Sequence, residues 1–248
     1  MDNDQWQIYQ RMIDDMPATA MVETSWTEEG PDPDKPVCVI VRIPFESEED
    51  LGLPDTDDEF EALDAMTEAL VKALSKHKAY FAGKLMHNFA HSLYFYTPGN
   101  DGIEQAVATA ISKFKGREAD VTCIDDPEWE RIGEDVWPTE VEVRWNEDMA
   151  VLSALEEGGD DMTTPREIEH MAIFASRETC EQFAEWSRQN GFTVGEPTQD
   201  EEDAFSIEFT KVSAPTIEAI FDQTGAITEI AEELGGMYDG WQCRLVKA

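Results

Sequence analysis

The chain has 248 residues, of which 55 are acidic and 18 basic, and its formal net charge is −37. Hydrophobic residues make up 41% of the sequence, with 12 Phe, 7 Trp and 5 Tyr, so an intrinsically disordered acidic chain is excluded. Direct binding to nucleic acid or to an anionic membrane is disfavoured, because both require clustered lysine and arginine.

The first half of the chain predicts an α+β unit in which helices cover one sheet. The expected elements, in chain order, are a short amphipathic helix at 6–16, strands at 18–26 and 37–43, a long helix at 60–74, strands at 79–87 and 90–97, a helix at 103–114 and a strand at 119–124. Residues 126–138 are interpreted as a connector. The expected order after the opening helix is β-β-α-β-β-α-β.

The second half predicts a ferredoxin-like unit, β-α-β-β-α-β with a leading helix. The expected elements are a helix at 145–157, a strand at 167–175, a helix at 177–189, strands at 192–194 and 205–210, a helix at 215–234 and a strand at 241–246. We therefore predict an α+β chain of two two-layer α/β sandwich domains, 1–140 and 141–248, with four strands in one antiparallel sheet in the second.

The acidity extends over both halves. Residues 1–145 contain 32 acidic and 12 basic residues, and residues 146–248 contain 23 and 6. A basic protein surface is the natural partner for such a chain. Solubility or adaptation to salt is an equally simple explanation of the same charge.

No catalytic or cofactor motif is recognisable. The cysteines Cys38, Cys123, Cys180 and Cys243 are far apart and form no C-x-x-C pair, which favours free buried thiols and a cytoplasmic location. The sequence contains neither a glycine-rich phosphate loop nor a G-x-S-x-G elbow, so we expect no bound nucleotide, flavin or metal.

Two local patterns could suggest a metal. His87 and His91 are four residues apart, but they span a strand turn rather than one helix face, so packing or surface roles are preferred. The run Gly158–Asp161 could suggest Ca²⁺, yet it lacks the alternating ligands of a calcium loop. A helix stop followed by a polar loop is the simpler interpretation.

The string Tyr238-Asp239-Gly240-Trp241 is the sharpest local feature. Asp-Gly favours a tight turn, which we expect between a helix end and the last strand. Packing of Trp241 in the core, with Asp239 capping the turn, is one interpretation. The other is an aromatic anchor for a partner, because Tyr and Trp dominate binding hot spots. The candidate partner-binding residues are Glu201, Glu202, Asp203, Tyr238, Asp239 and Trp241.

Residues from about 147 to 248 resemble the regulator of ribonuclease E activity B family of small acidic bacterial proteins. The matching segments, in order, are Glu157-Gly158-Gly159-Asp160, Arg166-Glu167-Ile168-Glu169-His170, Asn190-Gly191-Phe192-Thr193-Val194, the strand from Phe205 to Val212 and Gly236-Met237-Tyr238-Asp239-Gly240-Trp241. The family usually continues with Gly where this chain has Gln242. The resemblance implies a non-enzymatic protein that binds an RNA-degrading endonuclease and modulates it.

The first half is similar to the domain of unknown function 695 family. The similarity is carried by the Phe60–Leu74 helix, the strand that contains Gly83, Leu93-Tyr94-Phe95-Tyr96 and Pro127-Glu128-Trp129. That family implies no activity, no cofactor and no catalytic residue.

The sequence is compatible with three functions. The first is an acidic regulatory protein that binds a basic protein surface, such as that of a ribonuclease. The second is a small-ligand or enzymatic module in an interdomain cleft, with His87, His91, Tyr94 and Tyr96 as the residues of interest. The third is an immunity-type protein that shields a basic partner. The oligomeric state is left open by the sequence.

Overall fold

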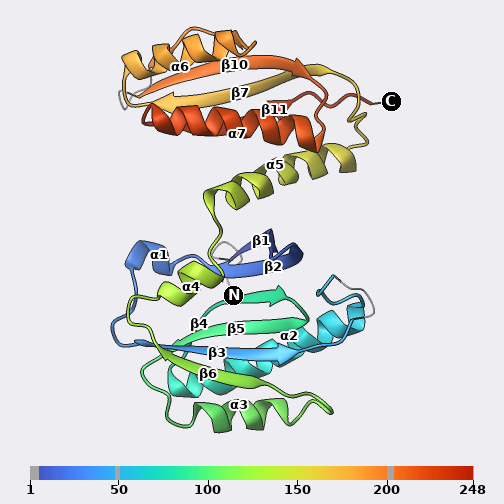
Figure 1. Ribbon diagram of the computed structural model, residues 1–248, viewed down its shortest axis with the longest axis vertical. Coiled ribbons are helices and arrows are strands. Elements are labelled where there is room, and N and C mark those ends of the chain that lie inside the picture. Colours follow the sequence, from blue (N-terminus) through green and yellow to red (C-terminus); the bar gives the residue numbers. More distant parts are fainter. Residues whose placement is uncertain (1–5, 48–50, 200–203, 248) are drawn as a thin grey trace. The chain divides into compact units, whose positions relative to one another are not determined.

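The chain divides into two units, Met1–Glu142 and Val143–Ala248, in the computed structural model, which describes residues 6–47, 51–199 and 204–247 (Figure 1). Each unit combines one antiparallel sheet with helices, so the predicted α+β class is confirmed. No helix in the described ranges is long and apolar enough to cross a membrane.

The N-terminal unit is built on a six-stranded sheet with the order β1-β2-β4-β5-β3-β6, in which every neighbouring pair is antiparallel. Its elements are β1 (Trp6–Ile13), β2 (Met16–Glu23), α1 (Trp26–Glu29), β3 (Val37–Pro44), α2 (Asp57–Leu74), the 3-10 turn η2 (Ser75–His77), β4 (Tyr80–His87), β5 (Ala90–Thr97), α3 (Ile103–Ile111), β6 (Asp120–Asp125) and α4 (Glu130–Asp135). Helices α2 and α3 pack on one face of the sheet and enclose the main core (Figure 1).

The predicted opening helix is wrong, because residues 6–13 form strand β1. This strand pairs with β2 from Trp6 opposite Glu23 to Ile13 opposite Met16. The turn residues Asp14 and Asp15 have φ angles of 50° and 62°, the left-handed conformation that two-residue hairpin turns require and that Asp tolerates. Cross-strand pairing therefore overrides the weak helical spacing of three apolar residues.

The predicted connector at 126–138 contains a short helix, α4, which packs over β4. Ile132 of α4 is fully buried. A side chain at Gly83 would place its Cβ 2.9 Å from the carbonyl oxygen of Met21 and 3.1 Å from Ile132. Glycine at this position of β4 therefore allows the close approach of both neighbours.

The C-terminal unit has a sheet with the order β11-β7-β10-β8, to which the short strand β9 adds by pairing with β10. Its elements are α5 (Glu140–Glu157, which begins just before the boundary), β7 (Arg166–Phe174), α6 (Arg177–Gln189), β8 (Thr193–Val194), β9 (Thr198–Gln199), β10 (Phe205–Ser213), α7 (Ile217–Glu233) and β11 (Gly236–Cys243). All four predicted strands are present, and the leading helix and ferredoxin-like order agree with the prediction. The one addition is β9, which lies in the segment predicted as an acidic loop.

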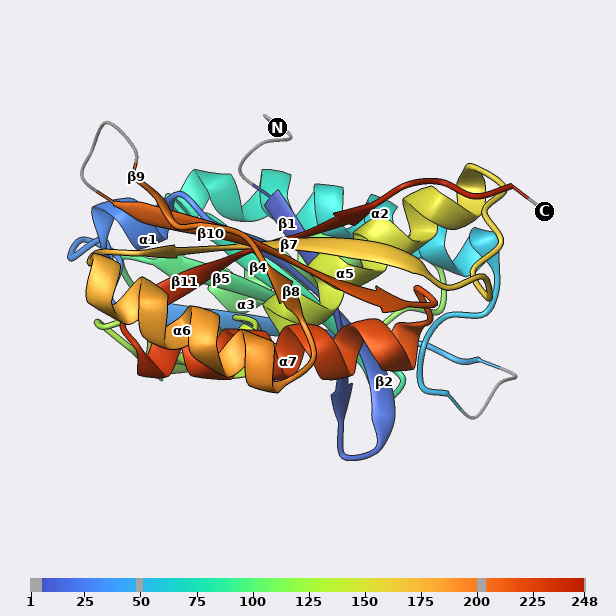
Figure 2. The same cartoon turned by 90° about the horizontal axis from the view of Figure 1, so that it is seen from above.

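The three helices cover the same face of this sheet. Side chains of α6 and α7 pack on Ala172, Phe174, Ile207 and Phe209. Leu152 of α5 packs on Ile168 and on Ile220 of α7. Figure 2 shows α6 and α7 on the same side of the strands. The opposite face of the sheet carries no helix of this unit among the described residues.

The predicted turn at Tyr238–Trp241 is wrong, because these residues lie inside the last strand. Strand β11 begins at Gly236, where a Cβ would meet the ring of Phe174 at 2.3 Å. Tyr238 pairs with Ala172 and Gly240 with Met171, which leaves Asp239 as the extra residue of a β-bulge. Gly240 has a φ of 101°, so the Asp-Gly pair supplies the conformational freedom that a turn and a bulge both require.

Candidate functional site

The two faces of the C-terminal sheet differ sharply in chemistry because strand side chains alternate. Along β7 the residues that face the helices are buried: Arg166, Ile168, His170, Ala172 and Phe174. The residues that alternate with them are Glu167, Glu169, Met171 and Ile173. We call the latter side of the sheet, with the outward residues of β10 and β11, the open face.

Cross-strand neighbours assemble the open face from β7, β10 and β11. Glu208 lies opposite Met171, and Glu169 lies between Thr210 on β10 and Gln242 on β11. The amide nitrogen Nε2 of Gln242 donates a hydrogen bond of 2.9 Å to Oε2 of Glu169. This bond fixes one carboxylate within the sheet surface while its second oxygen stays available.

A hollow of about 570 Å³ lies on the open face. Its lining includes the carboxylates Glu167, Glu169, Glu208 and Asp239, and no lysine or arginine is among the described residues that line it. Directly opposite or diagonal positions on a sheet lie about 5–8 Å apart, so these like charges repel one another and attract a cation. The side chain that best relieves this repulsion is a lysine or arginine from a partner.

Apolar side chains lie on the same open face as the acidic hollow. Val212 at the end of β10 is 67% exposed, and Met237 near the start of β11 is 56% exposed. Met171 at the centre is half-buried. An acidic field with apolar contact area is the combination that a protein interface with a basic partner uses, because charge steers the encounter and apolar contact holds it.

Of the candidates in this string, Asp239 and Trp241 both line the hollow of the open face. Trp241 also packs against Leu152 and Ile168, and Tyr238 packs in the core under the helix-covered face. The hydroxyl of Tyr238 lies 2.8 Å from Nδ1 of His170, whose ring stacks on Phe209 at a centroid distance of 5.3 Å. Burial lowers the pKa of His170 to about 4. This geometry supports the packing interpretation for Tyr238.

The indole of Trp241 is hydrogen-bonded to a buried carboxylate. Its Nε1 donates to Oδ1 of Asp148 at 2.8 Å, and the hydroxyl of Thr224 donates to Oδ2 at 2.6 Å. Burial raises the pKa of Asp148, while the two hydrogen bonds oppose that rise. Asp148 thus links α5, α7 and β11, and its bonds serve the fold.

The remaining predicted acids, Glu201, Glu202 and Asp203, lie outside the described residues. The carboxylates that the sequence interpretation did not single out are Glu167, Glu169 and Glu208. The sequence indicates these residues through the alternation of apolar and polar side chains along β7 and β10. That alternation predicts that the three side chains lie on the solvent side of one sheet.

The four residues of the ligand-module hypothesis do not meet in one pocket. His91 is fully buried on the α2 side of β5, where its Nε2 lies 2.9 Å from the hydroxyl of Thr67. Tyr94 and Tyr96 point to the other side of the same strand and donate to Asp135 and Asp126. The fourth, His87, contacts the carbonyl oxygen of Ile13 through Nε2.

The described parts of the chain contain no cluster of candidate metal ligands. No group of three or more His, Cys, Asp or Glu residues there could hold a metal ion. The four cysteines are free; Cys38 and Cys180 are buried, and Cys123 and Cys243 are half-buried. Burial raises the pKa of the Cys38 thiol to about 12, so it is not a poised nucleophile.

These features define a two-domain α+β protein whose ferredoxin-like unit presents an acidic open sheet face. The chain belongs to the family of unknown function DUF695, which it matches over residues 4–132. Residues 145–243 match the family Regulator of ribonuclease activity B. Both resemblances predicted from the sequence are thereby confirmed.

Other comparisons add little. No curated protein matches the chain. Among solved structures, the chain is similar to a crystal structure provisionally described as a glycine cleavage system transcriptional repressor. The two are 9% identical, the match covers 86% of this chain and 98% of that chain, and the TM-score is 0.22.

Proposed function

We propose that the protein is a non-enzymatic regulator that binds a basic surface of an RNA-degrading endonuclease through the open face of its C-terminal unit. The observation that carries this proposal is the row of carboxylates Glu167, Glu169, Glu208 and Asp239 across a sheet face that no helix among the described residues of the unit covers. The match of this unit to Regulator of ribonuclease activity B supports a ribonuclease as the class of partner.

The physical basis is competition for a basic surface. A nuclease surface that holds RNA carries lysine and arginine against the phosphates. The acidic sheet face is negatively charged, as RNA is, and its carboxylates are held in place by the sheet. The net charge of −37 attracts the protein towards such a basic surface over a distance set by the ionic strength. Occupancy of the RNA site by the open face then lowers the rate of RNA cleavage.

The non-enzymatic part of the proposal rests on how the titratable side chains are used. Three groups of this unit with perturbed pKa values, His170, Asp148 and Tyr238, each bond to another core group of the same unit. The His170 ring stacks on Phe209 in the core, and Asp148 and Tyr238 bond to core groups, so the open face is suited to binding rather than to proton transfer.

The identity of the partner is tested by affinity capture from a lysate of the source cell, with mass spectrometry, at low and high salt. We expect a ribonuclease, or another basic RNA-processing protein, to be recovered at low salt and reduced at high salt. Recovery of no such protein at low salt would contradict the proposal.

Reversing the charge of the open face is expected to slow association with that partner. The variant Glu169→Lys/Glu208→Lys/Asp239→Lys should associate about tenfold more slowly at low ionic strength, with a flatter salt dependence, because steering charge is lost from the contact itself. Surface plasmon resonance at two salt concentrations measures both effects.

A matched control separates the open face from net charge. Asp222, Glu229 and Glu232 are exposed on α7, and their replacement by lysine changes the net charge by the same amount. We expect this control to associate at nearly the wild-type rate. Equal slowing by the two triple variants would mean that the acidity acts as a diffuse field and that the open face is not the docking surface.

A further inference from the structure

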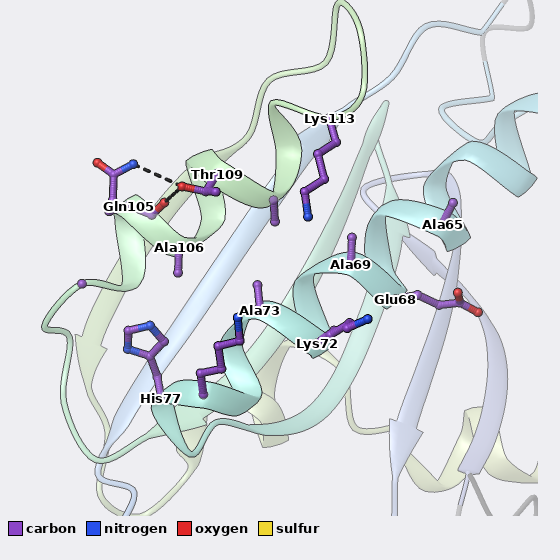
Figure 3. Close-up of a pocket in the computed structure, with 13 residues that line it drawn as sticks. Ala65, Glu68, Ala69, Lys72, Ala73, His77, Gln105, Ala106, Thr109 and Lys113 are labelled. Atoms are coloured by element: carbon purple, nitrogen blue, oxygen red, sulfur yellow. Dashed lines mark hydrogen bonds between the residues drawn. The ribbon is translucent and has the colours of Figure 1, made fainter.

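A basic groove interrupts the acidic surface of the N-terminal unit. It lies between α2 and α3, has a volume of about 670 Å³ and is shown in Figure 3. The two helices run antiparallel, because His77 after α2 lies against Gly102 before α3: a Cβ on Gly102 would sit 3.2 Å from the His77 ring. The groove therefore follows α2 over residues 65–77, which is about 18 Å at 1.5 Å per residue.

The floor of the groove is made of small side chains. Alanines from both helices line it: Ala65, Ala69, Ala73, Ala106 and Ala110. In Figure 3 the methyl groups of Ala69, Ala73 and Ala106 lie in the gap between the two helices. Small residues at this position let the backbone of a third helix approach closely, as ridge-into-groove packing requires.

The rim of the groove is positive. Lys72, Lys76 and Lys113 line it with exposed side chains, and Glu68 is the one carboxylate among its described lining residues. Figure 3 shows Lys113 reaching from the end of α3 towards α2. The three lysines take part in none of the ion pairs of the described residues: Lys84 pairs with Asp64 and Lys35 with Asp32, but the groove lysines have no such partner.

This arrangement is unexpected from composition, since acidic residues outnumber basic ones 55 to 18. Five of the nine lysines nevertheless fall in the short segments 72–78 and 113–115, which α2 and α3 bring to the same side of the unit. Charge complementarity with this rim requires an occupant that carries carboxylates or phosphates.

We propose that the groove docks an acidic amphipathic helix of a partner protein, with small apolar side chains against the alanine floor and Asp or Glu against the lysine rim. Helix-in-groove recognition needs an elongated apolar floor flanked by charge, and this groove has both. Single-stranded RNA fits less well, because its binding sites stack successive bases on several aromatic or arginine side chains, and His77 is the one such residue among the described lining residues. The inference concerns the N-terminal unit and is independent of the open face.

The test uses the whole chain and a synthetic helix of about 15 residues, with Ala and Leu at i, i+3, i+4 and i+7 and Glu at the flanking positions. Titration of the isotope-labelled protein by NMR is expected to give saturable shifts confined to residues 65–77 and 102–113. Lys72→Glu/Lys113→Glu should weaken the affinity at least about tenfold. Absence of saturable binding up to about 1 mM peptide would overturn the proposal.

The control is Lys78→Glu/Lys115→Glu, which makes the same charge change at exposed lysines outside the lining of the groove. Its affinity for the helix should stay near the wild-type value, and equal weakening by both variants would overturn the proposal.

Ala69→Leu/Ala106→Leu, which fills the floor and keeps the lysines, should also abolish binding. An oligouridine of about 10 nucleotides is the second probe; saturable binding of it at the groove without binding of the helix would assign the rim to RNA and overturn the proposal.

Discussion

Arg166→Met is expected to lower the free energy of unfolding of the C-terminal unit by about 3 kcal/mol, because it leaves a buried carboxylate without its counter-charge. The guanidinium donates to both oxygens of Asp160, at 2.5 and 2.6 Å. The exposed fractions of the two side chains are 7% and 0%. The same guanidinium also donates to the carbonyl oxygens of Arg244 and Asp161, so it ties β7 to the segment after α5 and to the segment after β11.

The measurement is urea-induced unfolding followed by a probe of the C-terminal unit. Arg177→Met is the matched control, since Arg177 forms an ion pair with Glu181 in which both side chains are mostly exposed. Exposed pairs contribute little, so the control should unfold at nearly the wild-type urea concentration. A midpoint for Arg166→Met as close to wild type as that of the control would show that the buried pair is dispensable.

The second large effect is a loss of stability in mild acid that originates at His170. Burial, and secondarily the charge of Lys211, lowers its pKa to about 4, whereas the ordinary value is about 6.5. Between these values the unfolded chain binds the proton and the folded chain does not. The free energy of unfolding therefore falls as the pH drops from about 6.5 to about 4, by an amount on the order of 3 kcal/mol, and this contribution stops changing below pH 4.

The difference between wild type and His170→Phe isolates this contribution from the titration of the many surface carboxylates. Phenylalanine keeps a flat ring against Phe209 and removes the titrating nitrogen. We expect the unfolding free energy of the wild type to fall more than that of the variant as the pH falls through this window, so that the difference between the two curves changes with pH. Parallel curves would mean that His170 is solvated in the folded state.

Much of the fold follows from local patterns. The alternation along β7 predicts both the strand and its two faces, because a one-residue shift in register would move Phe174 and Ile168 into solvent. The spacing of apolar residues in α2 predicts one buried face, and the structure buries Leu63, Met66 and Leu70 there. Such segments are long and strongly periodic, so local signal and tertiary packing agree.

The errors occur where local signals are ambiguous. Three apolar residues in 6–13 fit a helix as well as a strand, and only pairing with β2 decides between them. The sequence Asp239-Gly240 is compatible with a turn and with a β-bulge, because both use a backbone conformation that glycine adopts easily. Pairing with β7 makes it a bulge. The bulge also places Tyr238 and Trp241 against core residues of the helix-covered face, which the sequence left open between packing and an aromatic anchor.

The functional surfaces depend on contacts between distant segments. Lys72 and Lys113 line the same groove only because α2 and α3 pack against each other. The sequence predicts only a polar loop at Gly158–Asp161 and does not predict the ion pair of Asp160 with Arg166, because that pair depends on contacts with the segment that follows β11. The open face combines residues from 167 to 242, which the sheet order alone brings together.

The most direct test of the proposed function is RNA cleavage by the purified RNA-degrading endonuclease of the source cell, measured while the chain is titrated in. We predict that the wild type lowers the cleavage rate in a salt-dependent way, that Glu169→Lys/Glu208→Lys/Asp239→Lys requires at least about tenfold more protein, and that Asp222→Lys/Glu229→Lys/Glu232→Lys acts like the wild type. An unchanged cleavage rate at saturating wild-type protein, or equal inhibition by the two triple variants, would contradict the role assigned to the open face.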